Sequence, residues 1–328
     1  MKPKPLIYDW QDLAFTSKRP INSLRAVFIV APREISQLRF KQLIKAYLPQ
    51  HNIVLGLAKE PYVLGFENQP QFRMQKVNPL LNIIDKVNDA SKKHKIYQLN
   101  YYQRELIYLF DQLNFVKVIF VNGSWKYALH TQAPYFALAN RQCDYEMVSP
   151  FCNDAEAKAY ETRLSPQIIV ANHMANGKYS DVEMMERAFT ASHYSYDYNF
   201  QTGAVLGKLN RPGRTKYQLL TYAFNKVVPY QTYAMHHGAL RERNFSPPND
   251  LNYYDTAHAE VMLVLKSLKQ GIKLANTTLF TNLLPCPNCA LMLCDTEITE
   301  FVYAIDHSDG FAVQLLQNAG KKIRRIIP

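Results

Sequence analysis

The sequence predicts an α/β fold divided into two domains, and three observations lead to this prediction. The chain has 328 residues, which is long for a single domain. Short apolar runs rich in β-branched and aromatic residues alternate with segments whose apolar residues recur at helical spacing. A helical segment over 153–164 is followed by Pro166, which is typical of a helix end. We therefore expect domains at 1–165 and 166–328.

The first domain is predicted to be a separate α/β domain with a mixed sheet. Its strand candidates are 24–31, 52–58 and 116–125, and its helix candidates are 33–48 and 100–114. Arg33, Lys41 and Lys45 are expected to be exposed basic positions on the first of these helices. The helix that links the two domains is expected to be capped by Asn153 or Asp154. This half of the sequence has no Gly-rich phosphate loop and does not by itself indicate a function.

The second domain is predicted to contain a sheet between layers of helices. Ser180 and Glu183 form a capping-box pattern at the start of a helix. Two strands, 203–207 and 218–225, read as a hairpin, and a long loop over 226–255 follows. The remaining strands are expected at 276–282, 300–306 and 322–326, and the helices between them at 257–270, 287–295 and 311–319. Adjacent strand–helix–strand units favour a partly parallel sheet.

The formal net charge of +11 is spread unevenly along the chain. Residues 1–100 hold 16 basic and 7 acidic side chains, residues 101–200 hold 8 and 11, and residues 201–328 hold 14 and 9. A basic balance suits a polyanionic partner such as nucleic acid or nucleotide phosphates. The alternative is that the charge serves solubility alone, and composition does not decide between the two.

The composition also indicates a compartment. No run of 18 apolar residues is present, so we expect no transmembrane helix and no membrane partner. The N-terminus lacks the apolar stretch of a signal peptide. Five unevenly placed cysteines do not form a disulfide framework. We therefore expect a cytoplasmic protein; a homo-oligomer is compatible with the sequence, which leaves the oligomeric state open.

One constellation of residues carries chemistry. His258 and Glu260 lie at the start of one predicted helix, and Cys286 and Cys289 lie at the start of the next. The three-residue spacing puts both sulfurs on one helical face, and a helix N-terminus stabilises thiolates. One imidazole and two thiolates leave a fourth tetrahedral position open, as in catalytic zinc sites. Glu260 is not needed as a ligand and is predicted to transfer protons.

Two other interpretations of the cysteines are weaker. A redox pair usually follows a strand in a thioredoxin-like unit, whereas here prolines flank Cys286 on both sides. A closed structural zinc site needs a fourth ligand, and Cys294 is the nearest candidate. It lies five residues beyond Cys289, about 140° around the helix axis, so it points elsewhere.

The pattern H-x-E followed by P-C-x-x-C resembles the cytidine/deoxycytidylate deaminase superfamily, over residues 178–328. The segments "QTGAVLG", "AFN", "HAE", "PCPNCALML" and "GFAVQLLQNAGKKIRRI" carry the resemblance. It implies a three-layer α/β/α sandwich with a five-stranded mixed sheet and a zinc cofactor. The long loop 226–255 and the first domain depart from the small nucleotide enzymes and are similar to N-terminally extended members predicted to act on nucleic acid.

Substrate contacts are expected at four positions. Asn225 matches the family's substrate-contacting asparagine, and Ala259 lies between the histidine and the glutamate of the motif. Tyr254 precedes the helix and is expected to stack on a base, although core packing is a serious alternative. Arg243 is expected to hold a phosphate, although a solvated surface charge is as good an interpretation.

The reaction implied is hydrolytic deamination of a nucleobase. Zinc would make a bound water more acidic, and Glu260 would pass its protons to the ring nitrogen and to the leaving ammonia. The substrate is expected to be a free cytidine-type nucleotide. The alternatives are a cytosine or adenine within RNA or DNA, with the first domain binding the polymer, and an inactive zinc protein that binds nucleic acid. The intact Glu260 argues against the last of these.

Overall fold

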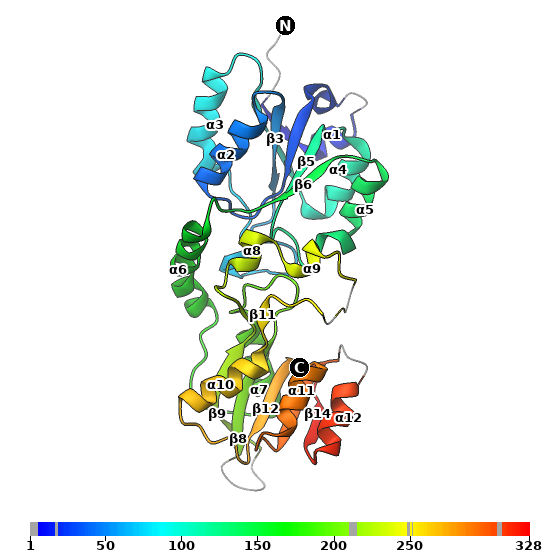
Figure 1. Ribbon diagram of the computed structural model, residues 1–328. Helices are drawn as coiled ribbons and strands as arrows, with labels where there is room; N and C mark the ends of the chain where they lie inside the picture. The colour runs from blue at the N-terminus through cyan, green and yellow to red at the C-terminus, as the bar shows by residue number, and fades with distance from the viewer. Residues whose placement is uncertain (1–5, 17–18, 210–214, 248–249, 251, 307–309) are drawn as a thin grey trace. The chain divides into compact units, whose positions relative to one another are not determined.

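The computed structural model describes residues 6–16, 19–209, 215–247, 250, 252–306 and 310–328 (Figure 1). The chain divides into two compact units. The first contains residues 1–163 and 232–253, and the second contains residues 164–231 and 254–328. The segment 232–253 therefore folds with the first unit. The single boundary at residue 165 that we expected from the sequence assigns this segment to the second domain. Within the described residues, no helix is both long and apolar enough to span a membrane.

The first unit is built on a six-stranded sheet in the order β1-β4-β3-β2-β5-β6. Its strands are β1 (Ile7–Asp9), β2 (Ala26–Val30), β3 (Asn52–Ala58), β4 (Ile96–Tyr101), β5 (Lys117–Val121) and β6 (Tyr145–Val148). Every pairing in it is parallel, so the prediction of a mixed sheet is wrong for this unit. The central strands β2 and β5 were predicted because continuous apolar runs are typical of strands covered on both faces.

Helices cover both faces of this sheet (Figure 1). They are α1 (Trp10–Ala14), α2 (Gln37–Tyr47), α3 (Asn78–Ala90), α4 (Leu106–Gln112) and α5 (Ala133–Asn140), with 3₁₀ turns at Pro20–Leu24, Pro70–Phe72, Gln103–Glu105 and Leu129–Thr131. Phe40 of α2 and Leu80 of α3 are buried in one core with Ile29 of β2. On the other face, the Phe110 ring of α4 packs edge-on against Phe28 and Phe120.

The segment 232–253 contains two short helices, α8 (Tyr233–His237) and α9 (Leu240–Arg243). Glu242 is buried and accepts hydrogen bonds from the Trp125 indole at 2.5 Å and the Leu129 backbone at 3.0 Å. The Met235 sulfur is a close neighbour of the Arg33 guanidinium. The segment is thus anchored to residues that follow β2 and β5.

Arg33 corrects one expectation from the sequence. It is fully buried rather than exposed, and α2 begins four residues later, after the Ser36 cap. Its guanidinium donates to the Tyr160 hydroxyl at 3.0 Å and to the Gln71 carbonyl. Lys41 and Lys45 do lie exposed on α2.

Helix α6 (Asp154–Ala171) is longer than predicted. The Asn153 side chain accepts from the Glu156 amide at 3.0 Å, as expected of a cap. Pro166 does not end the helix but lies inside it. Proline lacks one backbone donor, so its presence weakens the helix locally without obliging it to stop.

The second unit has a six-stranded mixed sheet in the order β14-β13-β12-β8-β9-β7. Its strands are β7 (Lys178–Tyr179), β8 (Gly203–Leu209), β9 (Tyr217–Phe224), β12 (Thr278–Leu283), β13 (Glu300–Ile305) and β14 (Lys322–Arg325), and β10 (Lys226–Val227) pairs separately with β11 (Thr256–Ala257). The predicted hairpin β8–β9 and the parallel β12–β13–β14 run are confirmed. The predicted count of five strands is too low, because the two-residue strand β7 adds an edge to β9.

Helices form a layer on each face of this sheet. They are α7 (Asp181–Ser192), α10 (Ala259–Lys269), α11 (Pro287–Cys294) and α12 (Phe311–Asn318). Met184 of α7 packs with Val205 of β8 on one face. Leu263 of α10 and Leu293 of α11 pack with Leu206 of β8 on the other. The unit is therefore the predicted three-layer sandwich.

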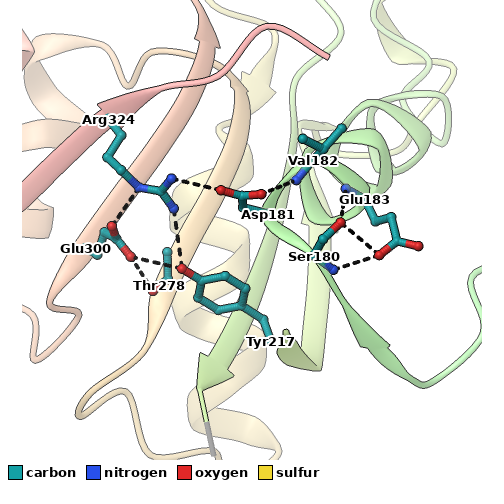
Figure 2. Close-up of polar contacts among 8 residues, drawn as sticks. All are labelled: Ser180, Asp181, Val182, Glu183, Tyr217, Thr278, Glu300 and Arg324. Carbon is teal, nitrogen blue, oxygen red and sulfur yellow. Dashed lines mark hydrogen bonds and ion pairs between the residues drawn. The ribbon is translucent and has the colours of Figure 1, made fainter. Parts of the chain in front are cut away.

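Three local features define the start of α7 and hold it on the sheet. Ser180 and Glu183 form the predicted capping box, in which the Ser180 amide donates to Glu183 at 2.7 Å. Figure 2 shows Arg324 of β14 paired with Asp181 at 3.0 Å and with Glu300 at 2.8 Å. At Gly203, a Cβ atom would lie 2.1 Å from the Ala188 carbonyl oxygen, so only glycine permits this approach of α7 to β8.

Candidate metal centre and catalytic carboxylate

Two helix N-termini bring the three predicted metal ligands together. His258 caps α10 directly after the short strand β11, and Cys286 caps α11 three residues after β12 ends. The Cys286 sulfur accepts from the Cys289 amide at 3.5 Å, which fixes the first turn of α11. Because unpaired N–H groups point outward at both helix starts, this location favours negatively charged sulfur.

The donor atoms have the spacing that a tetrahedral metal requires. The His258 Nδ1 atom lies 3.4 Å from the Cys286 sulfur and 3.3 Å from the Cys289 sulfur. All three donor atoms lie within 4.8 Å of one another. With Zn–S near 2.3 Å and Zn–N near 2.05 Å, tetrahedral angles give an N···S separation of about 3.5 Å. The residues therefore fit the metal that the sequence pattern implies.

The donors also perturb one another's protonation. The Cys289 thiol hydrogen-bonds to Cys286, and together with His258 it lowers the pKa of Cys286 to about 4. The same interaction raises the pKa of Cys289, and the Cys286 sulfur raises the pKa of His258. The three donor groups therefore interact with one another directly, in agreement with their short separations.

Glu260 lies in the first turn of α10, beside these ligands. It is 3% exposed, and this burial raises the pKa of its carboxyl. The Cys289 thiol is a hydrogen-bond neighbour of the carboxyl. Glu260 thus contacts one of the three ligand candidates without being one of them, which leaves its carboxyl available for proton transfer.

Two predicted substrate residues lie near the ligands. The Tyr254 ring packs edge-on against the ring of the predicted ligand His258, with 4.6 Å between centroids. Ala259 is fully buried between His258 and Glu260. Substrate contact by either residue remains a proposal.

Asn225 is buried and bonded to the loop that precedes β8. Its side-chain oxygen accepts from the Thr202 amide at 2.8 Å, and its amide group donates to Asp197 at 3.1 Å and to the Phe200 carbonyl at 2.7 Å. Both amide hydrogens are therefore engaged within the protein. Asn225 shapes the loop, and a substrate role would use its remaining acceptor capacity.

Arg243 is placed differently from the other predicted residues. It is the last residue of α9 and belongs to the first unit, whereas the three ligand candidates belong to the second. His236 and His237 also belong to the first unit, where their Nε2 atoms lie 3.4 and 3.0 Å from the Asp154 carboxylate. These two histidines form their own cluster with Asp154.

Sequence reasoning missed Asp197. This buried carboxylate accepts from the Asn199 amide at 2.7 Å and from Asn225, and its negative charge contributes to the raised pKa of His258. It lies in a loop whose sequence, "YDYN", shows only an Asx-turn pattern. Its hydrogen bond to Asn225 joins the loop before β8 to the residue after β9, and no local motif records this contact.

The comparison with known families agrees with this geometry. Residues 178–305 match the family model described as the cytidine and deoxycytidylate deaminase zinc-binding region. This segment belongs to that family. The match, with three residues positioned for a metal, makes zinc the cofactor of the deaminase-family domain.

Several solved structures are similar to part of the chain. The dCMP deaminase of cyanophage S-TIM5 is 17% identical, covering 44% of this chain and 95% of that chain, with a TM-score of 0.31. A tRNA:A34 deaminase is 19% identical over 44% and 91%, with a TM-score of 0.28. The Rib2 deaminase of Aspergillus oryzae is 11% identical over 45% and 84%, with a TM-score of 0.31. No curated protein matches the chain.

Proposed function

We propose that the chain is a hydrolase that removes the exocyclic amino group of a cytosine-type nucleobase, with a free nucleotide as its substrate. The observation that carries the proposal is the buried Glu260 carboxyl beside the donor set of His258, Cys286 and Cys289. A structural zinc site needs no such carboxyl, whereas hydrolytic deamination needs a group that accepts and returns protons.

In this proposal each residue has a defined task. His258, Cys286 and Cys289 hold zinc, which when bound supplies a Lewis acid that makes water more acidic. Glu260 accepts a proton from the attacking water and delivers it to the ring nitrogen of the base. It then takes the second proton of the attacking oxygen and transfers it to the leaving amino group, so that ammonia departs and a carbonyl remains. The burial of Glu260 keeps bulk water from competing for these protons.

The test is ammonia release by the full-length, zinc-loaded chain from dCMP, CMP, tRNA and single-stranded DNA. Turnover of dCMP or CMP supports the proposal. Ammonia release from no substrate, by a protein that holds about one zinc per chain, would contradict it.

Deamination of a base within RNA or DNA is the second candidate, favoured by the 16 basic against 7 acidic residues in 1–100. Lys41 and Lys45 are exposed on α2, whereas the buried Arg33 cannot contribute to a docking surface. If the first unit binds a polymer, K41E/K45E should weaken RNA or DNA binding and reduce its dependence on salt, because fewer counterions are released. An unchanged salt slope together with efficient turnover of dCMP or CMP would exclude the second candidate.

A further inference from the structure

The parallel sheet of the first unit has a strand order that defines a ligand-binding crevice. From β2 the chain builds β3 and β4 on one side, and then returns to build β5 and β6 on the other. All these strands are parallel, so their carboxyl ends share one edge. In open sheets of this kind, ligands bind outside the carboxyl ends where the strand order reverses, which here is between β2 and β5.

A cavity of about 460 Å³ lies at this edge. Its walls come from the ends of β2, β4 and β5 and from the segment 124–127 that follows β5. The volume is within the range of about 300–1,000 Å³ that small-molecule sites occupy. Two non-glycine residues on its walls, Ala31 and Tyr127, have positive φ angles of 21° and 65°. Backbone conformations of this kind are uncommon and are concentrated at functional sites.

The walls of this cavity are mainly aromatic and apolar. Phe120, Trp125 and Tyr127 line the cavity together with Tyr101. The Tyr101 side chain is fully buried, and its hydroxyl lies near the Ala31 backbone but makes no well-formed hydrogen bond to the described residues. The aromatic rings of these walls offer faces on which a planar ligand can stack.

Two cations also line this cavity. Arg104 is exposed and Lys126 is half-buried. Each lies over an aromatic ring, and neither has a carboxylate partner in the part of the chain that the structure describes. Lys59 of the same unit, by contrast, is paired with Asp9 at 2.8 Å. The positive charge at the cavity is therefore available to an anion.

We propose that this cavity binds a nucleoside phosphate, with its base between the aromatic walls and its phosphate at Arg104 and Lys126. Aromatic side chains stack on bases of any identity, and guanidinium and ammonium groups bind phosphate oxygens. Side chains hold the phosphate here, which accounts for a nucleotide site in a domain without a Gly-rich loop. The site lies within the first unit and is additional to the proposed zinc centre.

Calorimetric titration of the full-length chain with AMP and with CMP tests this proposal. It is carried out in the Glu260→Gln background, so that no substrate is consumed. We expect saturable binding that weakens at least tenfold in Arg104→Ala and in Lys126→Ala, because each removes a charge-assisted contact to phosphate. Lys86→Ala, which removes an exposed cation of α3, should bind as the parent does.

A second readout separates this cavity from the zinc centre. The chain has two tryptophans, and Trp125 lines the cavity, so Trp10→Phe leaves a local fluorescence reporter. AMP or CMP should change its emission with the dissociation constant found by calorimetry, and Ala133→Phe, which fills the cavity, should abolish the change. AMP is not a cytosine nucleotide and so is not the substrate proposed for the zinc centre; AMP binding that is indifferent to Arg104→Ala and Lys126→Ala would overturn the proposal. So would binding of oligonucleotides without binding of either mononucleotide.

Discussion

Replacement of Glu260 by glutamine tests the proposed chemistry with the smallest structural change. The amide has almost the shape of the carboxyl, so the buried site should keep its packing. Burial of a carboxylate costs free energy, and Glu260 is 3% exposed, so its loss should not destabilise the protein. Glu260 is outside the donor set of His258, Cys286 and Cys289, so zinc content should also be unchanged.

Turnover, by contrast, should nearly vanish. An amide can neither accept the proton of the attacking water nor return it to the leaving group, and each assisted proton transfer is worth about 10²- to 10⁴-fold. We therefore expect kcat for ammonia release from dCMP or CMP to fall by at least about 10²-fold. Zinc per chain and the unfolding temperature serve as controls. A variant that releases ammonia at the rate of the parent would remove Glu260 from the mechanism.

Three further predictions concern the metal, the core and pH. Cys286→Ser should lose zinc, whereas the matched variant Cys294→Ser should keep it, as metal analysis of both will show; the reverse pattern would refute the ligand assignment. Gly203→Ala should destabilise the second unit by about 1–3 kcal/mol in chemical denaturation, since overpacking against α7 costs this much; a variant as stable as the parent would contradict the close approach. Hydrogen bonds from Ser180 lower the pKa of Glu183, so its stabilising effect is present above its unfolded pKa, near 4.5, and is lost as the pH falls through the lower folded value. Glu183→Gln should thus reduce stability at pH 7 but not at pH 2, and equal losses at both would show that the carboxylate charge has no part in the cap.

Much of the second unit could be predicted because its local signals agree with its tertiary structure. Its order of elements, α10, β12, α11, β13, α12 and β14, was predicted because segments with apolar residues at helical spacing alternate with short, continuous apolar runs. The capping box formed by Ser180 and Glu183 marks the start of a helix within four residues. The grouping of His258, Cys286 and Cys289 was predictable because two of these residues each cap the N-terminus of a helix, and the third lies one turn further on.

The first unit was less predictable because three of its strands have weak local signals. β4 reads "IYQLNY", in which polar residues interrupt the apolar run, although five of its six residues are buried. β1 and β6 have only 3 and 4 residues. Parallel pairing also leaves no turn signal between neighbouring strands, since the chain returns through a helix or a long connection. The sheet direction could therefore not be derived from the sequence.

The substrate residues show where local reasoning stops. Asn225 matched a motif position, but its amide hydrogens are engaged by Asp197 and the Phe200 carbonyl. Arg243 lies within the predicted loop 226–255, and the part of this loop that contains it, 232–253, folds with the first unit. Both outcomes depend on contacts between segments far apart in the chain, which periodicity does not report.

The fold of segment 232–253 also determines how the role of the first unit can be tested. Deletion of residues 1–165 would remove Trp125 and Leu129, which donate to the buried Glu242. A carboxylate left without these donors costs several kcal/mol or draws in water, so the segment would lose its fold. This segment rejoins the second unit at Tyr254, four residues before the proposed ligand His258. Loss of activity on truncation could therefore result either from a missing docking surface or from the unfolding of the segment that precedes His258. Reversal of the exposed charges in the intact chain, as in K41E/K45E, distinguishes the two causes.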